Sequence, residues 1–204
     1  MRTRLAPLAL LGLSLLLAAC SAARPPVSAA APVAMLTRAE WGANAPVAPM
    51  QPHRIRWITI HHTATRQQPA RSLEEKMRAL QNFSQTDAPL ADGRMKLAWP
   101  DIPYHYYVDH AGQVAEGRDV RYAGDTNTSY DPAGHLLIVL EGSFGVEEPT
   151  AAQLATLERL VVGFARQYGV PAERIDGHKD HADTACPGTH LYELLPALRA
   201  KVAG

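Results

Sequence analysis

The stretch RIRWITIHHTAT, residues 54–65, is the segment around which the fold can be predicted. Its first half carries β-branched and aromatic residues in close succession, a pattern typical of a buried strand, and we place that strand at about residues 55–61. The strand runs into two adjacent histidines, His61 and His62. Because successive side chains of a strand point to opposite faces of a sheet, only one of these histidines can enter a given site.

Two further segments predict strands that accompany this one. Residues 135–142, HLLIVLEG, form a short apolar run that ends at Gly142 and is typical of a central strand covered on both faces. Residues 104–119, YHYYVDHAGQVAEGRD, show the pattern of two strands joined by a turn at DHAG. The chain therefore contains the strands of a sheet, separated by segments of another kind.

Those other segments have the period of helices. Leu73, Met77 and Leu80 follow Ser72 at helical spacing, and Ser72 is a suitable N-cap. A second helix is predicted from a capping box of Thr150 to a stop at Gly169. A third is predicted over about residues 190–202. Strands and helices thus alternate in a mixed order without a glycine-rich nucleotide fingerprint, which indicates an α/β domain.

The composition is that of one globular domain. The chain has 204 residues, of which 47% are hydrophobic and 20% are charged, and 20 Lys and Arg balance 20 Asp and Glu. A chain without net charge presents no overall field that would attract nucleic acid. We therefore expect no nucleic-acid partner.

The N-terminal residues are predicted to be a targeting signal. Arg2 and Arg4 precede the apolar run LAPLALLGLSLLLAA, which is short for a membrane span and typical of a secretory signal. Its end, LAAC at residues 17–20, resembles a bacterial lipobox, which implies cleavage before Cys20 and lipidation of its thiol. A plain signal peptide cut near Ala19 is the alternative interpretation.

This motif divides the chain into three predicted parts. They are a signal peptide over residues 1–19, a lipidated Ala/Pro-rich linker over residues 20–36, and one domain over residues 37–204. Because two or more acyl chains anchor a protein stably, Cys20 would hold the domain on a membrane. We expect a bacterial envelope protein on a membrane facing the periplasm, with the outer membrane favoured over the inner one.

The segment GHKDHADTACPG, residues 177–188, contains a second set of candidate ligands. His178 and Cys186 lie eight residues apart in a stretch with no helical or strand period, so a loop could turn both towards one ion. With Cys20 lipidated, Cys186 has no partner for an intrachain disulfide, and it is either a buried thiol or a metal ligand. Zinc binds imidazole nitrogen and thiolate sulfur, and the histidine pair at residues 61–62 could supply a third ligand.

Five blocks of the sequence occur in an order that resembles a known family. The family is the zinc-dependent N-acetylmuramoyl-L-alanine amidases, the group shared by phage amidase-type lysozymes and peptidoglycan recognition proteins. The resemblance covers about residues 37–198 and implies a single α/β domain with a central mixed sheet flanked by helices. The blocks are TRAEWGA, ITIHHTAT, DIPYHYYVDHAGQVAEGRD, HLLIVLEGSF and GHKDHADTACPG.

The resemblance also implies roles for individual residues. His61, His178 and Cys186 match the positions of the family's ligands to one zinc ion, and Tyr104 matches its catalytic tyrosine. Thr184 stands two residues before the cysteine, where the family has lysine or threonine. A threonine hydroxyl could donate a hydrogen bond to a developing oxyanion, although it contributes less electrostatic stabilisation than a lysine.

Three further residues are weaker candidates. Glu141 follows the apolar strand, where some relatives use an acidic residue, although a structural carboxylate is the favoured interpretation. His135 stands before that strand and could contact a ligand. Trp99 could line a groove for a peptide stem, since aromatic side chains commonly hold glycans and peptides.

The implied activity is hydrolysis of the amide bond between N-acetylmuramic acid and L-alanine in peptidoglycan or muropeptides, by a protein we expect to be a monomer. Retention of all three ligand positions and of Tyr104 favours catalysis. One alternative is a peptidoglycan-binding lipoprotein without catalysis. The other is a structural zinc protein of unrelated role, which needs a fourth ligand, with His181 the nearest candidate.

Overall fold

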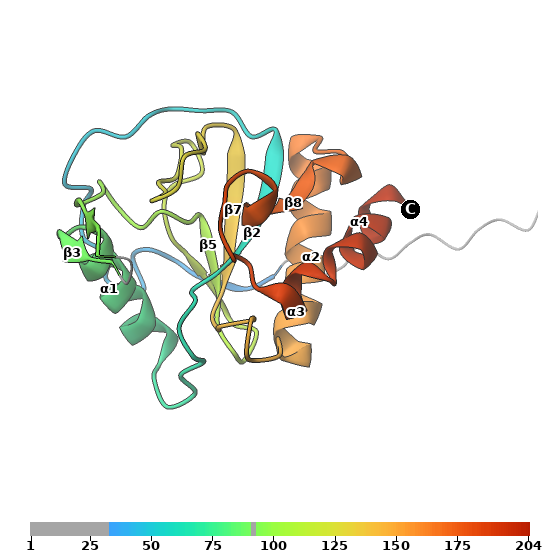
Figure 1. Ribbon diagram of the computed structural model, residues 1–204, viewed down its shortest axis with the longest axis horizontal. Helices are drawn as coiled ribbons and strands as arrows, with labels where there is room; N and C mark the ends of the chain where they lie inside the picture. Colours follow the sequence, from blue (N-terminus) through green and yellow to red (C-terminus); the bar gives the residue numbers. More distant parts are fainter. Residues whose placement is uncertain (1–32, 91–92) are drawn as a thin grey trace, which may run out of the picture. The chain divides into compact units, whose positions relative to one another are not determined.

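The computed structural model describes residues 33–90 and 93–204, and its centre is a six-stranded mixed sheet (Figure 1). The strand order is β1-β6-β5-β7-β2-β8, and every neighbouring pair is parallel except β5 with β6. A separate antiparallel pair is formed by β3 (Ala88–Pro89) and β4 (Met95–Lys96). The six strands are β1 (Met35–Leu36), β2 (Trp57–His62), β5 (Tyr106–Val108), β6 (Val114–Glu116), β7 (His135–Leu140) and β8 (Ile175–Gly177).

Helices cover both faces of this sheet, so the α/β class predicted from the sequence is confirmed. Figure 1 shows α1 on one side of the strands and α2 with α4 on the other. The described helices are α1 (Leu73–Ser84), α2 (Ala151–Tyr168), α3 (Thr189–Tyr192) and α4 (Leu195–Ala203), with short 3-10 turns η1 (Ala172–Arg174) and η2 (His178–Asp180).

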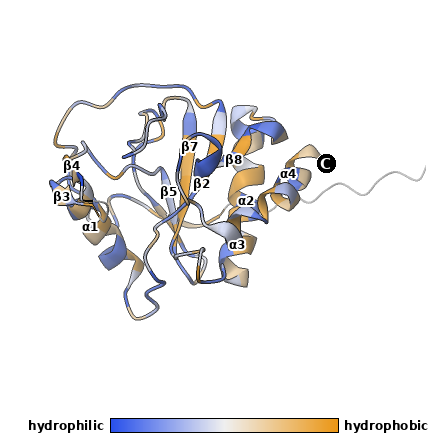
Figure 2. Ribbon diagram, in the orientation of Figure 1, coloured by the Kyte–Doolittle hydropathy of each residue, from blue (hydrophilic) through white to orange (hydrophobic). Residues whose placement is uncertain are grey.

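Side chains that alternate along β2 and β7 divide the core into two clusters. Ile58 and Ile60 of β2 pack with Ile138 of β7 in the cluster that includes α2. Val139, the next residue of β7, belongs to the cluster that includes Met77 of α1. Figure 2 shows hydrophobic residues gathered in β7 and α2. Because side chains alternate along a strand, one row faces α2 and the other faces α1.

The predicted helix ends of α1 and α2 are confirmed. Ser72 accepts a hydrogen bond from the backbone N–H of Glu75, whose side chain bonds back to the Ser72 N–H. Thr150 and Gln153 form the same capping box at α2, and Gly169 ends α2 with φ +65°. Glycine adopts this left-handed conformation without the steric cost that a side chain brings.

The C-terminal helix differs from the prediction of one helix over residues 190–202. The structure has two, α3 and α4, with Pro196 in the first turn of α4. A proline inside a helix has no N–H to donate, and its ring clashes with the carbonyl four residues earlier, which here is that of Tyr192. Proline is tolerated in a first turn, so the chain ends one helix and starts another.

The predicted linker boundary at residue 36 is also different. Met35 and Leu36 form β1 and pair with Val114 and Ala115 of β6, and Val33 packs against the core. These apolar residues complete one edge of the sheet, so at least residues 33–36 belong to the fold. The predicted signal peptide and Cys20 lie outside the described residues. Within residues 33–90 and 93–204, no helix combines the length and hydropathy needed to cross a membrane.

Candidate metal centre

Three predicted ligands, distant in sequence, meet in the structure. One donor atom each from His61, His178 and Cys186 lies within 4.8 Å of the others, and all three side chains are largely buried. His61 is in β2, His178 follows directly after β8, and Cys186 lies in the loop after η2. Because β2 and β8 pair in parallel, their carboxyl ends lie together at one edge of the sheet.

The side chains of His61 and His62 point to opposite faces of the sheet, as expected for neighbours in a strand. The His61 ring lies beside Tyr104, with centroids 5.2 Å apart. His62 faces the opposite side, where its Nδ1 accepts a hydrogen bond from the backbone N–H of Phe144 at 3.2 Å. The backbone N–H of His62 points to the Cys186 Sγ at 3.4 Å. His61 is thus the histidine that can enter the site, and His62 supports the sulfur through its backbone.

The loop after β8 is held in place by backbone contacts. The N–H of Lys179 donates to the carbonyl oxygen of Cys186 at 2.9 Å, which closes the loop between the two ligands. Gly188 follows with φ +86°, and a Cβ there would lie 2.4 Å from the backbone carbon of Phe144. Only glycine allows this approach, which explains the glycine after the cysteine and proline.

The spacing of the donors fits a tetrahedral metal. The Nδ1 of His61 is 3.6 Å from the Sγ of Cys186. Zinc–sulfur and zinc–nitrogen bonds of about 2.3 and 2.0–2.1 Å at a tetrahedral angle place two such ligands roughly 3.6 Å apart. The rings of His61 and His178 are also adjacent, with centroids 4.6 Å apart. The His61 and Cys186 donors therefore have the separation that a tetrahedral zinc ion requires, and His178 is adjacent to them.

The electrostatic environment also fits a cation. Burial lowers the pKa of His61 well below its ordinary value, with His178 adding to the effect, and burial lowers the pKa of His178 to about 4. Both imidazoles are then neutral near pH 7 and can offer a lone pair. Burial raises the pKa of Cys186 to about 12, so its thiolate needs a nearby positive charge. A bound divalent metal supplies that charge and displaces the proton.

Further polar groups are buried around the cluster. The Nε2 of His61 is buried and makes no hydrogen bond to the part of the chain that the structure describes. Tyr104 precedes β5, and burial, then Cys186 and Tyr130, raise the pKa of its phenol. Tyr104 is therefore a neutral hydroxyl donor beside the ligands. The Thr184 Oγ1 accepts from the N–H of Cys186 at 3.2 Å, so its own proton can be donated elsewhere.

Glu141 lies outside this cluster. Its Oε1 accepts from the backbone N–H of Gln68 at 2.8 Å, and its Oε2 accepts from the Lys76 Nζ and the His110 N–H, each at 2.9 Å. The side chain is 1% exposed. A buried carboxylate with both oxygens occupied and a lysine beside it is suited to holding α1 and the loop after β2, and is poorly placed to take a proton from water.

His135 and Trp99 are not brought to the ligands. The Nδ1 of His135 bonds to the Thr59 hydroxyl at 2.8 Å, and its ring stacks on Trp57. Trp99 is half-buried under the Lys96 ammonium group, 4.6 Å from its ring centroid. Each therefore has a packing partner of its own.

His181 is likewise separate from the three ligands. Its Nε2 is 3.5 Å from the Asp176 carboxylate, and its ring packs against Tyr130. Among the described residues, the donor set around Cys186 thus has three members. Tetrahedral coordination by three protein ligands leaves one position for water or substrate, as in catalytic zinc sites.

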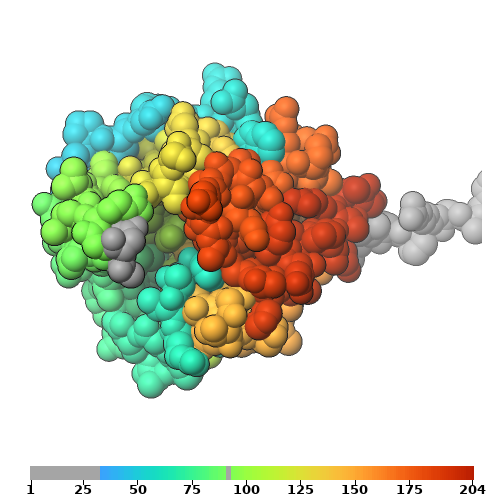
Figure 3. All heavy atoms as spheres, viewed as in Figure 1, coloured from blue at the N-terminus to red at the C-terminus, as the bar shows by residue number. Residues whose placement is uncertain are grey.

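Two residues of the loop between β6 and β7 contact the site without having been predicted. The hydroxyl of Thr128 is 2.9 Å from the Nε2 of His178, and the Tyr130 ring lies 5.1 Å from the His178 ring. This loop has no strand or helix period, so no sequence signal indicates which of its side chains turn inward. Figure 3 shows this loop, in yellow, bordering the red C-terminal segment on one face of the molecule.

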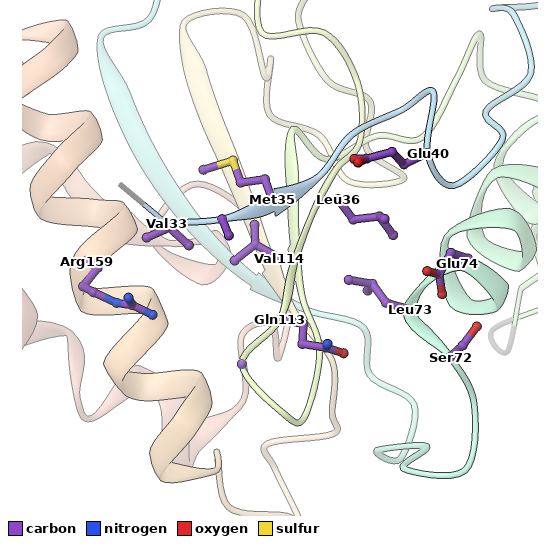
Figure 4. Close-up of a pocket in the computed structure, with 12 residues that line it drawn as sticks. Val33, Met35, Leu36, Glu40, Ser72, Leu73, Glu74, Gln113, Val114 and Arg159 are labelled. Atoms are coloured by element: carbon purple, nitrogen blue, oxygen red, sulfur yellow. The ribbon is translucent and has the colours of Figure 1, made fainter. Parts of the chain in front are cut away.

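The cluster is distinct from a pocket of about 780 Å³ beside β1. Figure 4 shows that pocket between Val33 and Met35 on one side and Leu73 and Glu74 on the other, with Arg159 of α2 at its rim. None of the three ligands lines it. The chemistry of the donor atoms, rather than the size of a hollow, therefore identifies the candidate site.

We predict that Cys186→Ser loses most of the bound metal, because a serine hydroxyl is a far weaker ligand than a thiolate, whereas His181→Gln keeps it. Metal analysis of the purified domain and both variants measures this. Equal metal in Cys186→Ser and the parent would remove Cys186 from the site, and loss in His181→Gln would indicate a closed four-ligand site.

Comparison with known proteins identifies the family. Residues 51–189 match the family model described as N-acetylmuramoyl-L-alanine amidase. Peptidoglycan recognition protein 1 of Mus musculus is 28% identical over 146 residues, which cover 70% of this chain and 75% of that protein. The N-acetylmuramoyl-L-alanine amidase of Homo sapiens is 26% identical over 144 residues, which cover 68% of this chain and 23% of that protein.

A solved structure agrees with the sequence matches. Peptidoglycan recognition protein-LE, in complex with tracheal cytotoxin, a monomeric diaminopimelic acid-type peptidoglycan, is similar with a TM-score of 0.66 and 26% identity. The similarity covers 80% of this chain and 92% of that chain. The family match spans more than half of the sequence and includes the three candidate ligands, Tyr104 and Thr184. The chain therefore belongs to the N-acetylmuramoyl-L-alanine amidase family.

Proposed function

We propose that the protein hydrolyses the amide bond between N-acetylmuramic acid and L-alanine of peptidoglycan or muropeptides, with one zinc ion held by His61, His178 and Cys186. The observation that carries this proposal is a buried set of three donor atoms within 4.8 Å of one another, beside a protonated phenol. Such a set leaves a coordination position for the reaction.

An amide is a poor electrophile, so its hydrolysis needs an activated water, a stabilised oxyanion and a proton for the leaving amine. Zinc bound at this site would lower the pKa of its water towards about 7 and polarise the scissile carbonyl. The residues of the chain supply the other requirements. Tyr104 would donate its O–H to the developing oxyanion, and the Thr184 hydroxyl, which accepts from the Cys186 N–H, would donate its proton to the same oxygen.

The positions of Tyr104 and Glu141 favour the tyrosine as the catalytic group. The Tyr104 ring is adjacent to that of His61. The Glu141 carboxylate accepts three hydrogen bonds and pairs with the buried Lys76. A general base must be within hydrogen-bond reach of the water that it activates. In this proposal Tyr104 acts in the reaction, and Glu141 holds the surrounding structure.

Recognition of peptidoglycan without cleavage is the second candidate function. It is favoured by the similarity to peptidoglycan recognition protein 1 and to a recognition protein solved with a peptidoglycan fragment. Binding alone would not require a complete set of metal ligands. The presence of all three donors in this chain supports hydrolysis over recognition alone.

We also propose that the protein acts in the bacterial envelope, attached to a periplasm-facing membrane through lipidated Cys20. The support is the LAAC segment at residues 17–20 and the Ala/Pro-rich stretch after it. A tether of this composition would keep the domain near the membrane while allowing it to reach the cell wall.

The activity is tested with defined muropeptides. The zinc-loaded protein is expected to release the stem peptide from N-acetylmuramic acid, chelator is expected to abolish the release, and added zinc is expected to restore it. Mass analysis of the products measures this, with Cys186→Ser as the inactive control. Tight binding of the muropeptide by the zinc-loaded parent without cleavage would show recognition instead.

We predict that Tyr104→Phe keeps its fold and zinc but loses roughly 10²-fold or more in kcat with little change in KM, because the lost hydrogen bond forms mainly in the transition state. Glu141→Gln should chiefly lower stability, on the order of 2 kcal/mol, because Lys76 loses the nearer of its two buried carboxylate partners while Asp109 remains. Kinetics and urea unfolding of both variants measure this. A parental kcat in Tyr104→Phe with a collapsed kcat in a folded Glu141→Gln would reverse the assignment.

The proposed lipid anchor is tested by replacing Cys20. Cys20→Ala is expected to leave the precursor unlipidated, whereas the parent chain carries a lipid at Cys20. Mass spectrometry of the protein expressed in a bacterium, together with its partition between membrane and soluble fractions, measures this. A parent chain that carries no lipid and is cut near Ala19 would favour the plain signal peptide.

A further inference from the structure

The loop between β6 and β7 places the Thr128 hydroxyl against Nε2 of the candidate ligand His178, here called its outer nitrogen. The Thr128 Oγ1 lies 2.9 Å from the Nε2 of His178, which is 8% exposed. In a neutral imidazole, one ring nitrogen carries a hydrogen and the other has a lone pair. The hydrogen-bond partner of one nitrogen therefore determines whether the other nitrogen has the hydrogen or the lone pair. The contact with Thr128 therefore bears on which nitrogen of His178 can bind the metal.

A second hydroxyl is within reach of the Thr128 proton. The Thr126 Oγ1 is 2.7 Å from the Thr128 Oγ1 and accepts from the Thr128 backbone N–H at 3.1 Å. The single proton of the Thr128 hydroxyl can be donated to Thr126, which leaves a lone pair of Thr128 for an N–H of His178. In this arrangement the Nε2 of His178 carries the hydrogen and its Nδ1 is the free donor.

The other histidine ligand, His61, has no such hydroxyl contact from the residues that the structure describes. In His61 it is Nδ1 that lies 3.6 Å from the Cys186 Sγ, while the Nε2 of His61 has no partner among the described residues. Only His178 of the two therefore has a side-chain hydroxyl on its outer nitrogen. Tyr130, two residues after Thr128, packs against the His178 ring with centroids 5.1 Å apart. The loop thus contacts both the Nε2 and the ring of His178.

We propose that Thr128 is a positioning residue for the metal: by accepting the Nε2–H of His178, it presents Nδ1 to the ion. The inference rests on the proposed function only in placing a metal at this cluster, and it requires no catalysis. Hydrogen bonds to the outer nitrogen of a ligating histidine orient the ring and make the ligand more basic, and their loss typically weakens metal binding about 10–100-fold. Thr128 touches no reacting atom in this role.

The test is metal affinity measured without substrate, by competition of zinc or cobalt(II) with a chelator. Thr128→Val has nearly the shape of threonine but no hydroxyl, and we expect zinc affinity to fall about 10–100-fold. Thr128→Ser keeps the hydroxyl and should stay close to the parent. The matched control is Thr86→Val, which removes a threonine hydroxyl that bonds the Asn82 carbonyl at 2.8 Å on the exposed end of α1.

A second measurement tests the tautomer in the unaltered protein. In the zinc-bound parent, histidine ¹⁵N NMR should show His178 with a metal-bound Nδ1 and a protonated Nε2. This result does not depend on whether any variant folds, and circular dichroism of the metal-free variants shows whether they do.

The outcomes separate this inference from the proposed function. Parental zinc affinity in a folded Thr128→Val, or coordination through the Nε2 of His178, would overturn the role of Thr128. A parent that binds zinc and fails to cleave muropeptides would overturn the proposed hydrolysis and leave the inference intact. A parent that binds no zinc would overturn both.

Discussion

The parallel pairing of β2 with β8 is the constraint on which the site depends. It registers Ile60 with Gly177, so the next residues, His61 of β2 and His178 directly after β8, lie side by side at the same edge of the sheet. Their backbones are held by the hydrogen bonds of the sheet and by the core beneath it. The loop that carries Cys186 only has to turn back over this edge, and the glycine at 188 lets it approach the backbone of Phe144 closely.

The two faces of β2 contact different kinds of side chain. Ile58 and Ile60 face the α2 side and belong to the main core, whereas Thr59 and His61 point the other way, towards polar and aromatic side chains. A metal centre on that second face can contain buried imidazoles and a thiol without interrupting the apolar core. This is why an almost entirely buried strand can both pack in the core and supply a candidate ligand, His61.

Hydrogen-bond partners distinguish the two groups that compete for the role of catalytic residue. Tyr104 has its pKa raised by burial and by Cys186, so it remains a hydrogen donor beside the ligands. Glu141 is buried too, but Lys76 and two backbone N–H groups compensate its charge. A compensated carboxylate stabilises a fold, whereas an uncompensated hydroxyl is available to a substrate.

The sequence by itself determined the α/β class, the caps of α1 and α2, and the candidates His61, His178 and Cys186, because periodicity and short motifs are local properties of the chain. It did not indicate the break before α4, where the effect of Pro196 on the preceding turn decides, or the edge strand β1, which exists only through pairing with β6. Thr128 depends still more on the tertiary structure. Its loop has no period, and only the packing of that loop against η2 brings its hydroxyl to His178. Local patterns specify which residues can bind a metal, whereas contacts between distant segments decide which of their atoms face it.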